Sequence, residues 1–438
     1  MSKTDKAYTR TFLSSTLSYG FIALLLVGCS FLTNKNTASS YTVQSTNKQP
    51  ATNEIHGIVS PLHMIDAHIG WTQSWYSVGD TIHNDILRTI DGGVHWRVMF
   101  TCLPVSSDGG KAAGFVTCNT DFRSSMIASV LEPQANNQTR IYHTSDGGQT
   151  WLGSSIDARS FNQSSPVFVD ALHGWFFGTD TFPGRDPSSS YIGQNIVLFR
   201  TNDGGKTWNK IASSPAISQL PVSSDDAYGT QPPFTADARM TFLNTTTGWL
   251  IGMISQADST STPWLYVTHD AGTTWHKVAL TFPAQALVLW VPQFFDTDNG
   301  LLPIMVSGPA PAYVHQTSIY TTHDAGTTWT QSAFVPFDVT NAVFRSMESA
   351  SADAEDGKKF FYTTTDGWKH WIKHTATTPF TQLYGFTFVS STLGWAIGEN
   401  RGMGLPEPGG GRRAGDIMSI QHTTDGGHTW HEIAHSKV

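Results

Sequence analysis

The sequence predicts an all-β protein, a single seven-bladed β-propeller built from four-stranded antiparallel blades. Three observations predict it: an octapeptide that recurs seven times, a second Gly-Trp repeat that falls between the octapeptides, and the composition. The chain of 438 residues holds 39 Gly and 15 Trp, while only 14% of its residues are charged. Many turn formers and aromatics with few charges favour an exported all-β fold. No long segment shows helical periodicity.

The octapeptide has the pattern Thr-x-Asp-x-Gly-x-Thr-Trp, as in TNDGGKTW ending at Trp208. Its Asp and Trp positions are Asp91 and Trp96, Asp146 and Trp151, Asp203 and Trp208, Asp270 and Trp275, Asp324 and Trp329, Asp366 and Trp371, and Asp425 and Trp430. The sixth copy, TTDGWKHW, is degenerate. Repetition at such periods is typical of propellers, in which each period supplies one blade.

The residue types of the octapeptide suit a tight turn. Asp accepts hydrogen bonds from the amides of its own loop, and Gly adopts a positive φ without steric cost. The Thr hydroxyl also bonds locally, and the Trp then opens the next strand and buries a large ring. These acids are therefore predicted to be structural.

The second repeat gives each period its remaining strands. It reads as an apolar strand, a polar turn, and then Gly-Trp before another strand, as in FVDALHGW ending at Trp175. In the third blade the four strands are expected at 165–169, 175–178, 196–201 and 207–212. Residues 55–438 are then one propeller, because blades that cannot bury their faces alone must close into a ring.

The N-terminus reads as a lipoprotein signal peptide over residues 1–28. Basic residues precede an apolar run that ends at Leu26-Val27-Gly28-Cys29, which resembles the bacterial lipobox. An uncleaved membrane anchor is the alternative, but the twelve-residue run is shorter than the roughly 20 residues that span a bilayer. We expect an exported protein with lipid on Cys29, held at the outer face of a bacterial membrane. Residues 29–54 are polar and predict a flexible tether.

Two cysteines remain for the propeller, Cys102 and Cys118. An even number in an oxidising compartment favours a disulfide over two buried thiols. No Cys/His spacing fits a zinc site, so no metal and no cofactor are expected. The formal net charge of −8 argues against a nucleic-acid partner, which requires a basic footprint.

The octapeptide is identified as the Asp-box, or bacterial neuraminidase repeat. With the Gly-Trp strands, the chain resembles the photosystem II assembly and stability factor family over roughly residues 55–435. Members of that family are seven-bladed propellers of the cyanobacterial lumen and are often lipoproteins. Sortilin-type receptors and xyloglucan-cleaving enzymes share the repeats. The family binds partners through a basic surface, for which Arg401, Arg412 and Arg413 are the nearest counterpart here.

The expected function is that of a membrane-anchored scaffold that binds a protein partner and is not a catalyst. The partner is expected on the face formed by the loops at 179–195, 213–238, 256–264, 306–316 and 400–416, because loops on rigid scaffolds carry function. The alternative is a glycoside hydrolase, sialidase-like or xyloglucanase-like, with two carboxylates on that loop face. The Arg-Ile-Pro motif of sialidases is absent before Asp91. Non-repeat acids for the alternative are Asp225, Asp226, Asp237, Glu348, Glu355, Asp356, Glu399 and Glu407.

Lipidation can be tested by labelling. We predict that Cys29→Ala abolishes incorporation of a fatty-acid analogue, because the thiol that carries the lipid is gone. Ser30→Ala, the adjacent control, should be labelled like the unaltered chain. Undiminished labelling of Cys29→Ala would refute the lipoprotein assignment.

Overall fold

The computed structural model describes one compact unit within Asn36–Val438, and Met1–Lys35 lie outside the described residues. The described residues are 40–44, 51–52, 54–106, 118–134, 138–160, 165–180, 196–213, 232, 238–255, 261–283, 285–287, 290–307, 315–335, 337, 339–354, 360–375, 382–400 and 417–437. Every regular element among them is a β-strand. Within these ranges no helix is long and apolar enough to span a membrane.

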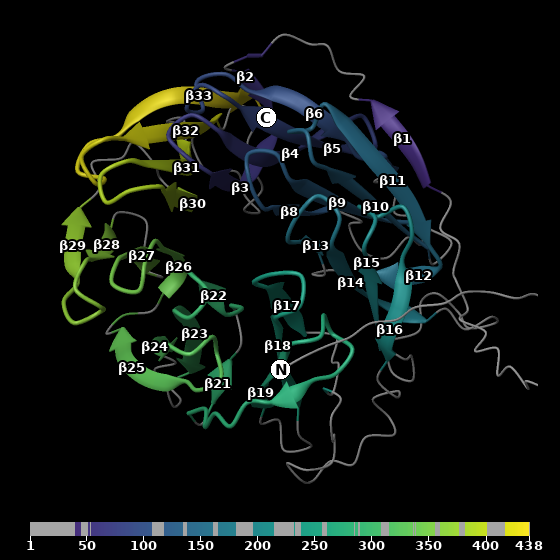
Figure 1. The fold of residues 1–438 in the computed structure, drawn as a ribbon. Helices are drawn as coiled ribbons and strands as arrows, with labels where there is room; N and C mark the ends of the chain where they lie inside the picture. The colour runs from purple at the N-terminus through teal and green to yellow at the C-terminus, as the bar shows by residue number, and fades with distance from the viewer. Residues whose placement is uncertain are drawn as a thin grey trace, which may run out of the picture. The chain divides into compact units, whose positions relative to one another are not determined.

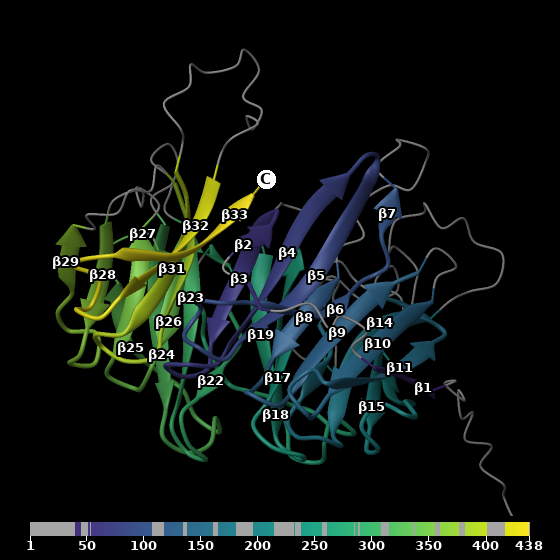
Figure 2. The same ribbon diagram turned by 90° about the horizontal axis from the view of Figure 1, so that it is seen from above.

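The strands form seven antiparallel sheets arranged as the blades of a propeller, which confirms the predicted fold class (Figure 1). Blade 1 contains β3 (Ile58–Met64), β4 (Gly70–Val78), β5 (Thr81–Thr89) and β6 (Arg97–Thr101), with β7 (Val105–Ser106) beside β5. Blade 2 contains β8 (Asn119–Phe122), β9 (Ala128–Pro133), β10 (Thr139–Thr144) and β11 (Thr150–Ile156). The longest strands, β4 and β5, form a hairpin that extends at one edge of the ring (Figure 2).

Blades 3 and 4 follow the same order. Blade 3 contains β12 (Ala158–Ser160) and β13 (Val167–Phe168), which both pair with β14 (Gly174–Asp180), then β15 (Ile196–Thr201) and β16 (Asn209–Ser213). Blade 4 contains β17 (Arg239–Phe242), β18 (Gly248–Ser255), β19 (Ser261–Thr268) and β20 (His276–Lys277). The strands predicted for blade 3 thus match, to within a few residues, those of the structure.

The last three blades complete the ring. Blade 5 contains β21 (Ala286–Leu287) and β22 (Gln293–Phe294), which both pair with β23 (Gly300–Ser307), then β24 (His315–Thr322) and β25 (Thr330–Val335). Blade 6 contains β26 (Val339–Phe344), β27 (Ala350–Ala354), β28 (Phe360–Thr364) and β29 (Ile372–Thr375). Blade 7 contains β30 (Gln382–Phe388), β31 (Gly394–Asn400), β32 (Ile417–Thr423) and β33 (His431–Lys437).

An N-terminal segment, which we call the strap (residues 40–56), adds to the outer edges of three blades. Its strand β1 (Ser40–Gln44) pairs antiparallel with β11 of blade 2, and its strand β2 (Glu54–His56) pairs parallel with β33 of blade 7. Between them, Thr52 exchanges both backbone hydrogen bonds with Trp96 of blade 1, at 3.0 and 2.7 Å. The strap therefore crosses the junction between the last and first blades. Its described residues 40–44, 51–52 and 54 belong to the segment predicted to be a tether.

Aromatic stacking holds neighbouring blades together. In blades 1, 3 and 4, the Trp near the start of the second strand stacks on the aromatic residue that ends the innermost strand of the next blade. Trp175 lies 3.6 Å from Phe242 with the rings 7° from parallel, and Trp249 lies 4.1 Å from Phe294. A Gly precedes that Trp because a Cβ there would strike the blade's own aromatic residue, at 2.7 Å from the Phe168 ring in the case of Gly174. The Gly-Trp repeat is thus a packing device.

Blades 2 and 6 lack Gly-Trp, and the register shows what replaces it. Ala128 pairs with Phe122, and Ala350 pairs with Phe344, so Ala takes the Gly position and Ser follows in place of Trp. In blade 2 the empty Trp slot is filled by His143 of β10. Its ring stacks 3.8 Å from Phe168 of blade 3, and only 4% of the residue is exposed.

Burial of His143 carries an electrostatic cost. Neither ring nitrogen makes a hydrogen bond of acceptable geometry, although the backbone near Ala171 and Ala128 acts weakly on the ring. Desolvation lowers the pKa of His143 to about 4, and these weak contacts only partly oppose it. The unfolded chain therefore takes up a proton more readily than the folded chain as the pH falls from about 6.5 toward 4, and folding becomes less favourable over that range.

We predict that His143→Phe removes this acid sensitivity while keeping the stacked ring. Relative to its value at pH 8, the unfolding free energy of the original chain should fall by about 2 kcal/mol more at pH 5 than that of the variant. Chemical denaturation at the two pH values measures the difference. Equal pH dependence of both proteins would show that His143 is not held neutral.

Candidate functional site

The Asp-box turns lie where each blade's third strand meets its fourth, and their carboxylates are engaged. In the third box, Asp203 Oδ1 accepts hydrogen bonds from the Thr201 hydroxyl (2.8 Å) and the Thr207 amide (2.9 Å), and Oδ2 accepts one from the Thr207 hydroxyl (2.6 Å). The Thr201 oxygen in turn accepts from the Gly205 amide at 2.9 Å. In two boxes a His replaces the second Thr, and His95 Nδ1 lies 2.7 Å from Asp91 Oδ2.

Each box also docks on the turn between the first and second strands of its own blade. The amide of the residue after the box Asp donates to a carbonyl of that turn in all seven blades, as Gly204 does to Leu172 at 2.9 Å. Partial burial opposes ionisation of Asp203, but the hydrogen bonds from Thr207 and Thr201 prevail and lower its pKa. The pKa is also lowered at Asp91, Asp146, Asp270, Asp324, Asp366 and Asp425. These carboxylates stabilise the fold above about pH 4 and lose that effect as the pH falls.

The acids outside the boxes are best located by comparing equivalent positions of the blades. The residue before the aromatic that ends the innermost strand (Met64 in blade 1) defines a ring of seven positions, which we call the inner ring. Its members are His63, Asp121, Val167, Thr241, Gln293, Val343 and Thr387. The innermost strands that carry them face the ring axis (Figure 1). Asp121 is the one carboxylate among the seven.

Among the partly exposed acids of the described residues, Asp121 is the one whose pKa is raised. Desolvation raises its pKa to about 6, although the Arg123 guanidinium and the amide of Phe168 favour the charged form. Arg123 is exposed, and its Nη2 donates to the carbonyl of Phe242 in blade 4 over a long 3.4 Å. On the neighbouring strand, His63 retains solvent contact while surrounding protein lowers its pKa by desolvation. Blade 2 thus carries a carboxyl on its innermost strand and a guanidinium just after it, and the innermost strand of blade 1 carries an imidazole of lowered pKa.

A second polar group is buried between blades 1 and 2, around the segment Thr101–Leu103. The Thr101 hydroxyl donates to Asp85 Oδ1 at 2.6 Å, and the Leu103 amide donates to Glu132 Oε1 at 2.6 Å. Asp85 Oδ2 also accepts from the Tyr76 hydroxyl at 3.1 Å. The two acids are 7% and 3% exposed. They are therefore oriented by the protein and shielded from solvent.

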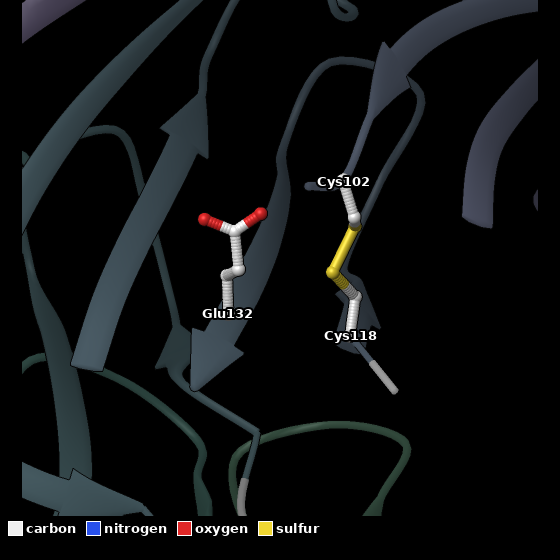
Figure 3. Close-up of side chains that lie close together, drawn as sticks. All are labelled: Cys102, Cys118 and Glu132. Atoms are coloured by element: carbon white, nitrogen blue, oxygen red, sulfur yellow. A yellow bond between two sulfur atoms is a disulfide. The ribbon is translucent and has the colours of Figure 1, made fainter. Parts of the chain in front are cut away.

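Glu132 also lies beside a disulfide. Cys102 and Cys118 are bonded to each other, and both sulfurs and a Glu132 carboxylate oxygen lie within 4.8 Å of one another (Figure 3). Burial raises the pKa of Glu132, against the hydrogen bond from Leu103 and the charge of Arg140. Glu132 Oε2 reaches the strap through Tyr142, whose hydroxyl lies 3.4 Å from it and accepts from Tyr41 at 2.9 Å.

The repeat shows that these acids are exceptions. Four residues before the first Thr of each box, where blade 1 has Asp85, the other blades have Arg140, Val197, Trp264, Ser318, Phe360 and Ser419. The positions equivalent to Glu132 are Ser74, Gly178, Gly252, Ile304, Ala354 and Gly398. Blades 1 and 2 thus carry acids where the repeat requires none, and departures from a local rule concentrate at functional sites.

The residues proposed from the sequence are only partly within the described structure. Cys29, Arg401, Arg412 and Arg413 lie outside it, as do Asp225, Asp226, Asp237, Glu355, Asp356 and Glu407. Glu348 is exposed in a turn, and Glu399 is in β31. Much of the loop face expected to bind a partner also lies outside. Sequence reasoning did not single out Asp121. The feature that could have identified it is its position directly before the aromatic residue that ends an innermost strand.

No protein-family model matches the chain, and no curated protein is similar to it at a significant level. Several solved structures are similar to it at low sequence identity. A GH74 xyloglucanase from Xanthomonas campestris is 13% identical with a TM-score of 0.46, over 90% of this chain and 69% of that one. The β-propeller domain of the Trilobed protease from Pyrococcus furiosus is 9% identical with a TM-score of 0.49, over 88% and 98%. A polysaccharide lyase of family PL25, an ulvan lyase, is 11% identical with a TM-score of 0.46, over 89% and 97%.

The seven blades of the structure agree with the predicted propeller, and the similar structures bear on the expected function. The expectation of a non-catalytic scaffold is contradicted, because the similar structures are mainly carbohydrate-acting enzymes, which also include a sialidase. They agree better with the alternative, a glycoside hydrolase. At 9–14% identity, however, the similarity shows the fold alone, so any activity must be argued from the residues of this chain.

The structural role of the boxes can be tested at Asp203. We predict that Asp203→Ala lowers the unfolding free energy by about 1–2 kcal/mol, because three hydrogen bonds of the turn are lost. Lys206→Ala, a change in the same turn at an exposed side chain, should have little effect. Equal stability of the two variants in thermal or chemical denaturation would contradict the role given to the box carboxylate.

Proposed function

We propose that the protein is a carbohydrate-active enzyme that cleaves glycosidic bonds at the inner ring, with Asp121 as the general acid. The observation that carries the proposal is the position of Asp121, the one carboxylate of the inner ring and partly exposed, where desolvation raises its pKa to about 6. Glycosidic cleavage requires a carboxylic acid that keeps its proton near working pH and gives it to the leaving oxygen. A perturbed carboxyl with a specific charged neighbour is a candidate for such a role.

The neighbours of Asp121 suit the remaining steps. As the proton passes to the leaving oxygen, Arg123 stabilises the carboxylate that forms, because it already favours the charged form. Water then attacks the anomeric carbon, and a base must accept its proton. His63 is the described group of the inner ring that we assign to this step, since desolvation lowers the pKa of its imidazole and favours the neutral form. Asp85 and Glu132 are too buried to meet a substrate and are assigned no step.

The proposal agrees with the alternative weighed from the sequence but changes its location. The acids considered there belonged mainly to loops on the face opposite the boxes. Asp121 instead lies one residue before the end of β8, next to the turn that docks on the box of blade 2. A glycan would then approach the ring axis from the side of the Asp-boxes. The xyloglucanase and the lyase that share the fold act on polysaccharides, which guides the choice of test substrates.

The assay measures new reducing ends from a panel of neutral and acidic polysaccharides. We predict that Asp121→Asn lowers the rate at least about a hundredfold, because the proton donor is lost. Asp80→Asn, an exposed carboxylate in the β4–β5 turn, is the matched control and should leave the rate unchanged.

Activity of the original chain should fall as the pH rises through about 6, since Asp121 must be protonated.

Two results would reject the proposal. One is undiminished activity of Asp121→Asn on a substrate that the original chain cleaves. The other is the absence of cleavage of every glycan by a folded original chain.

A further inference from the structure

The buried cluster beside the disulfide offers chemistry that glycan cleavage does not use. Cys102 follows β6, Cys118 precedes β8, and Glu132 lies in β9, so three separate segments bring their side chains together (Figure 3). The two sulfurs and a carboxylate oxygen lie within 4.8 Å of one another, and all three residues are buried. Among the described residues this is the one group of Cys, His and acidic side chains that converges in this way.

We propose that reduction of the Cys102–Cys118 disulfide converts this cluster into a binding site for a thiophilic divalent cation such as Zn²⁺. Two molecules of a low-molecular-weight thiol would be oxidised to their own disulfide and supply two electrons and two protons, which break the protein S–S bond and leave two Cys thiols. The cation then displaces both thiol protons and is held by two thiolates and the Glu132 carboxylate. In the oxidised chain the sulfurs are bonded to each other and do not serve as ligands, since the thiolate is the form that binds metal.

The geometry requires only small movements. Bonds of about 2.3 Å to sulfur and about 2.0 Å to oxygen place tetrahedral ligand atoms roughly 3.3–3.8 Å apart. Breaking the disulfide lets the sulfurs separate to such a distance, and the carboxylate oxygen needs to move by about an ångström. Thiolate with carboxylate is a donor set that zinc accepts, and three protein ligands leave a fourth position for water.

The surroundings already orient the carboxylate as outer ligands do in metal sites. The Leu103 amide fixes Oε1 at 2.6 Å, and the Gln134 side chain donates to Oε2 at 3.1 Å. Arg140 lies farther from Oε2, at 3.8 Å, and its side chain is 35% exposed, so it can turn to solvent when a cation arrives. Partners of this kind typically change metal affinity 10- to 100-fold.

Once the disulfide is reduced, electrostatics favours the binding of a cation at this site. Two thiols that ionise beside a buried carboxylate would place like charges together in a medium of low dielectric, which is unfavourable. A divalent cation offsets these charges and makes ionisation favourable. Binding should therefore release protons and weaken as the pH falls.

The test uses the full chain, reduced with a phosphine and then titrated with Co²⁺ and Zn²⁺. We expect the reduced protein to show sulfur-to-cobalt charge-transfer absorption, to lose it when Zn²⁺ is added, and to hold about one ion per chain after desalting. The oxidised protein should show none of these. Glu132→Gln should weaken binding at least about tenfold. Glu348→Gln, an exposed turn acid, is the control and should bind like the original chain.

The cysteines are tested separately. Cys118→Ser, which cannot form the disulfide, should bind far more weakly than the reduced original chain, and this comparison decides the matter if Glu132→Gln does not fold. Absence of cobalt–thiolate absorption in the reduced original chain would overturn the proposal. So would affinity in Glu132→Gln or Cys118→Ser equal to that of the original. None of these readouts depends on glycan cleavage, so the two proposals fail independently.

Discussion

Closure of the ring is the constraint on which the rest of the structure depends. A blade cannot bury both faces alone, so each must pack on two neighbours. Six junctions join blades that are consecutive in the chain, but the seventh must join blade 7 to blade 1. There the Trp395 indole donates to the carbonyl of Gly92 at 2.7 Å, and side chains of both blades share one core. All four strands of blade 7 come from the C-terminal end, so the strap, and not a strand exchanged between the termini, crosses this junction.

The fold could be predicted from the sequence because the residue types of its repeats each favour one local structure. The box residues predict a tight turn, because Asp, Gly and Thr have the hydrogen bonds and the positive φ that it needs. Gly-Trp predicts a contact between neighbouring blades. Blades 2 and 6 were harder, since Ala128 and Ala350 replace Gly and remove the motif without changing the register. The stacking of His143 on Phe168 could not be foreseen, because it joins strands of different blades that only the closed ring brings together. The strands of the strap could not be predicted for a similar reason. Its polar sequence has no apolar face, and its strands are stabilised by backbone pairing at blade edges that only the folded ring provides.

The candidate site was less predictable than the fold. Asp121 lies in one of the two blades that lack Gly-Trp, so its strand was not located by motif and its side chain had no assigned direction. Glu132 and Asp85 look like ordinary surface acids until the register places them against Thr101–Leu103. Comparison of equivalent positions in seven blades would have exposed all three, because their counterparts carry no carboxylate. The acids and arginines chosen from the loops lie mainly outside the described residues and stay predictions, as does the resemblance to photosystem II assembly factors.

The strap provides the most direct test of the account, which holds that the ring is closed by side-chain packing reinforced across the blade 7–blade 1 junction. The measurement compares a chain that begins at Asn36 with one that begins at Gly57, by denaturation and by amide hydrogen exchange. We predict that the shorter chain unfolds more easily, and that amides of β11 and β33 and near Trp96 exchange faster, because these edges lose their partners. Equal unfolding and equal exchange in the two chains would contradict the account.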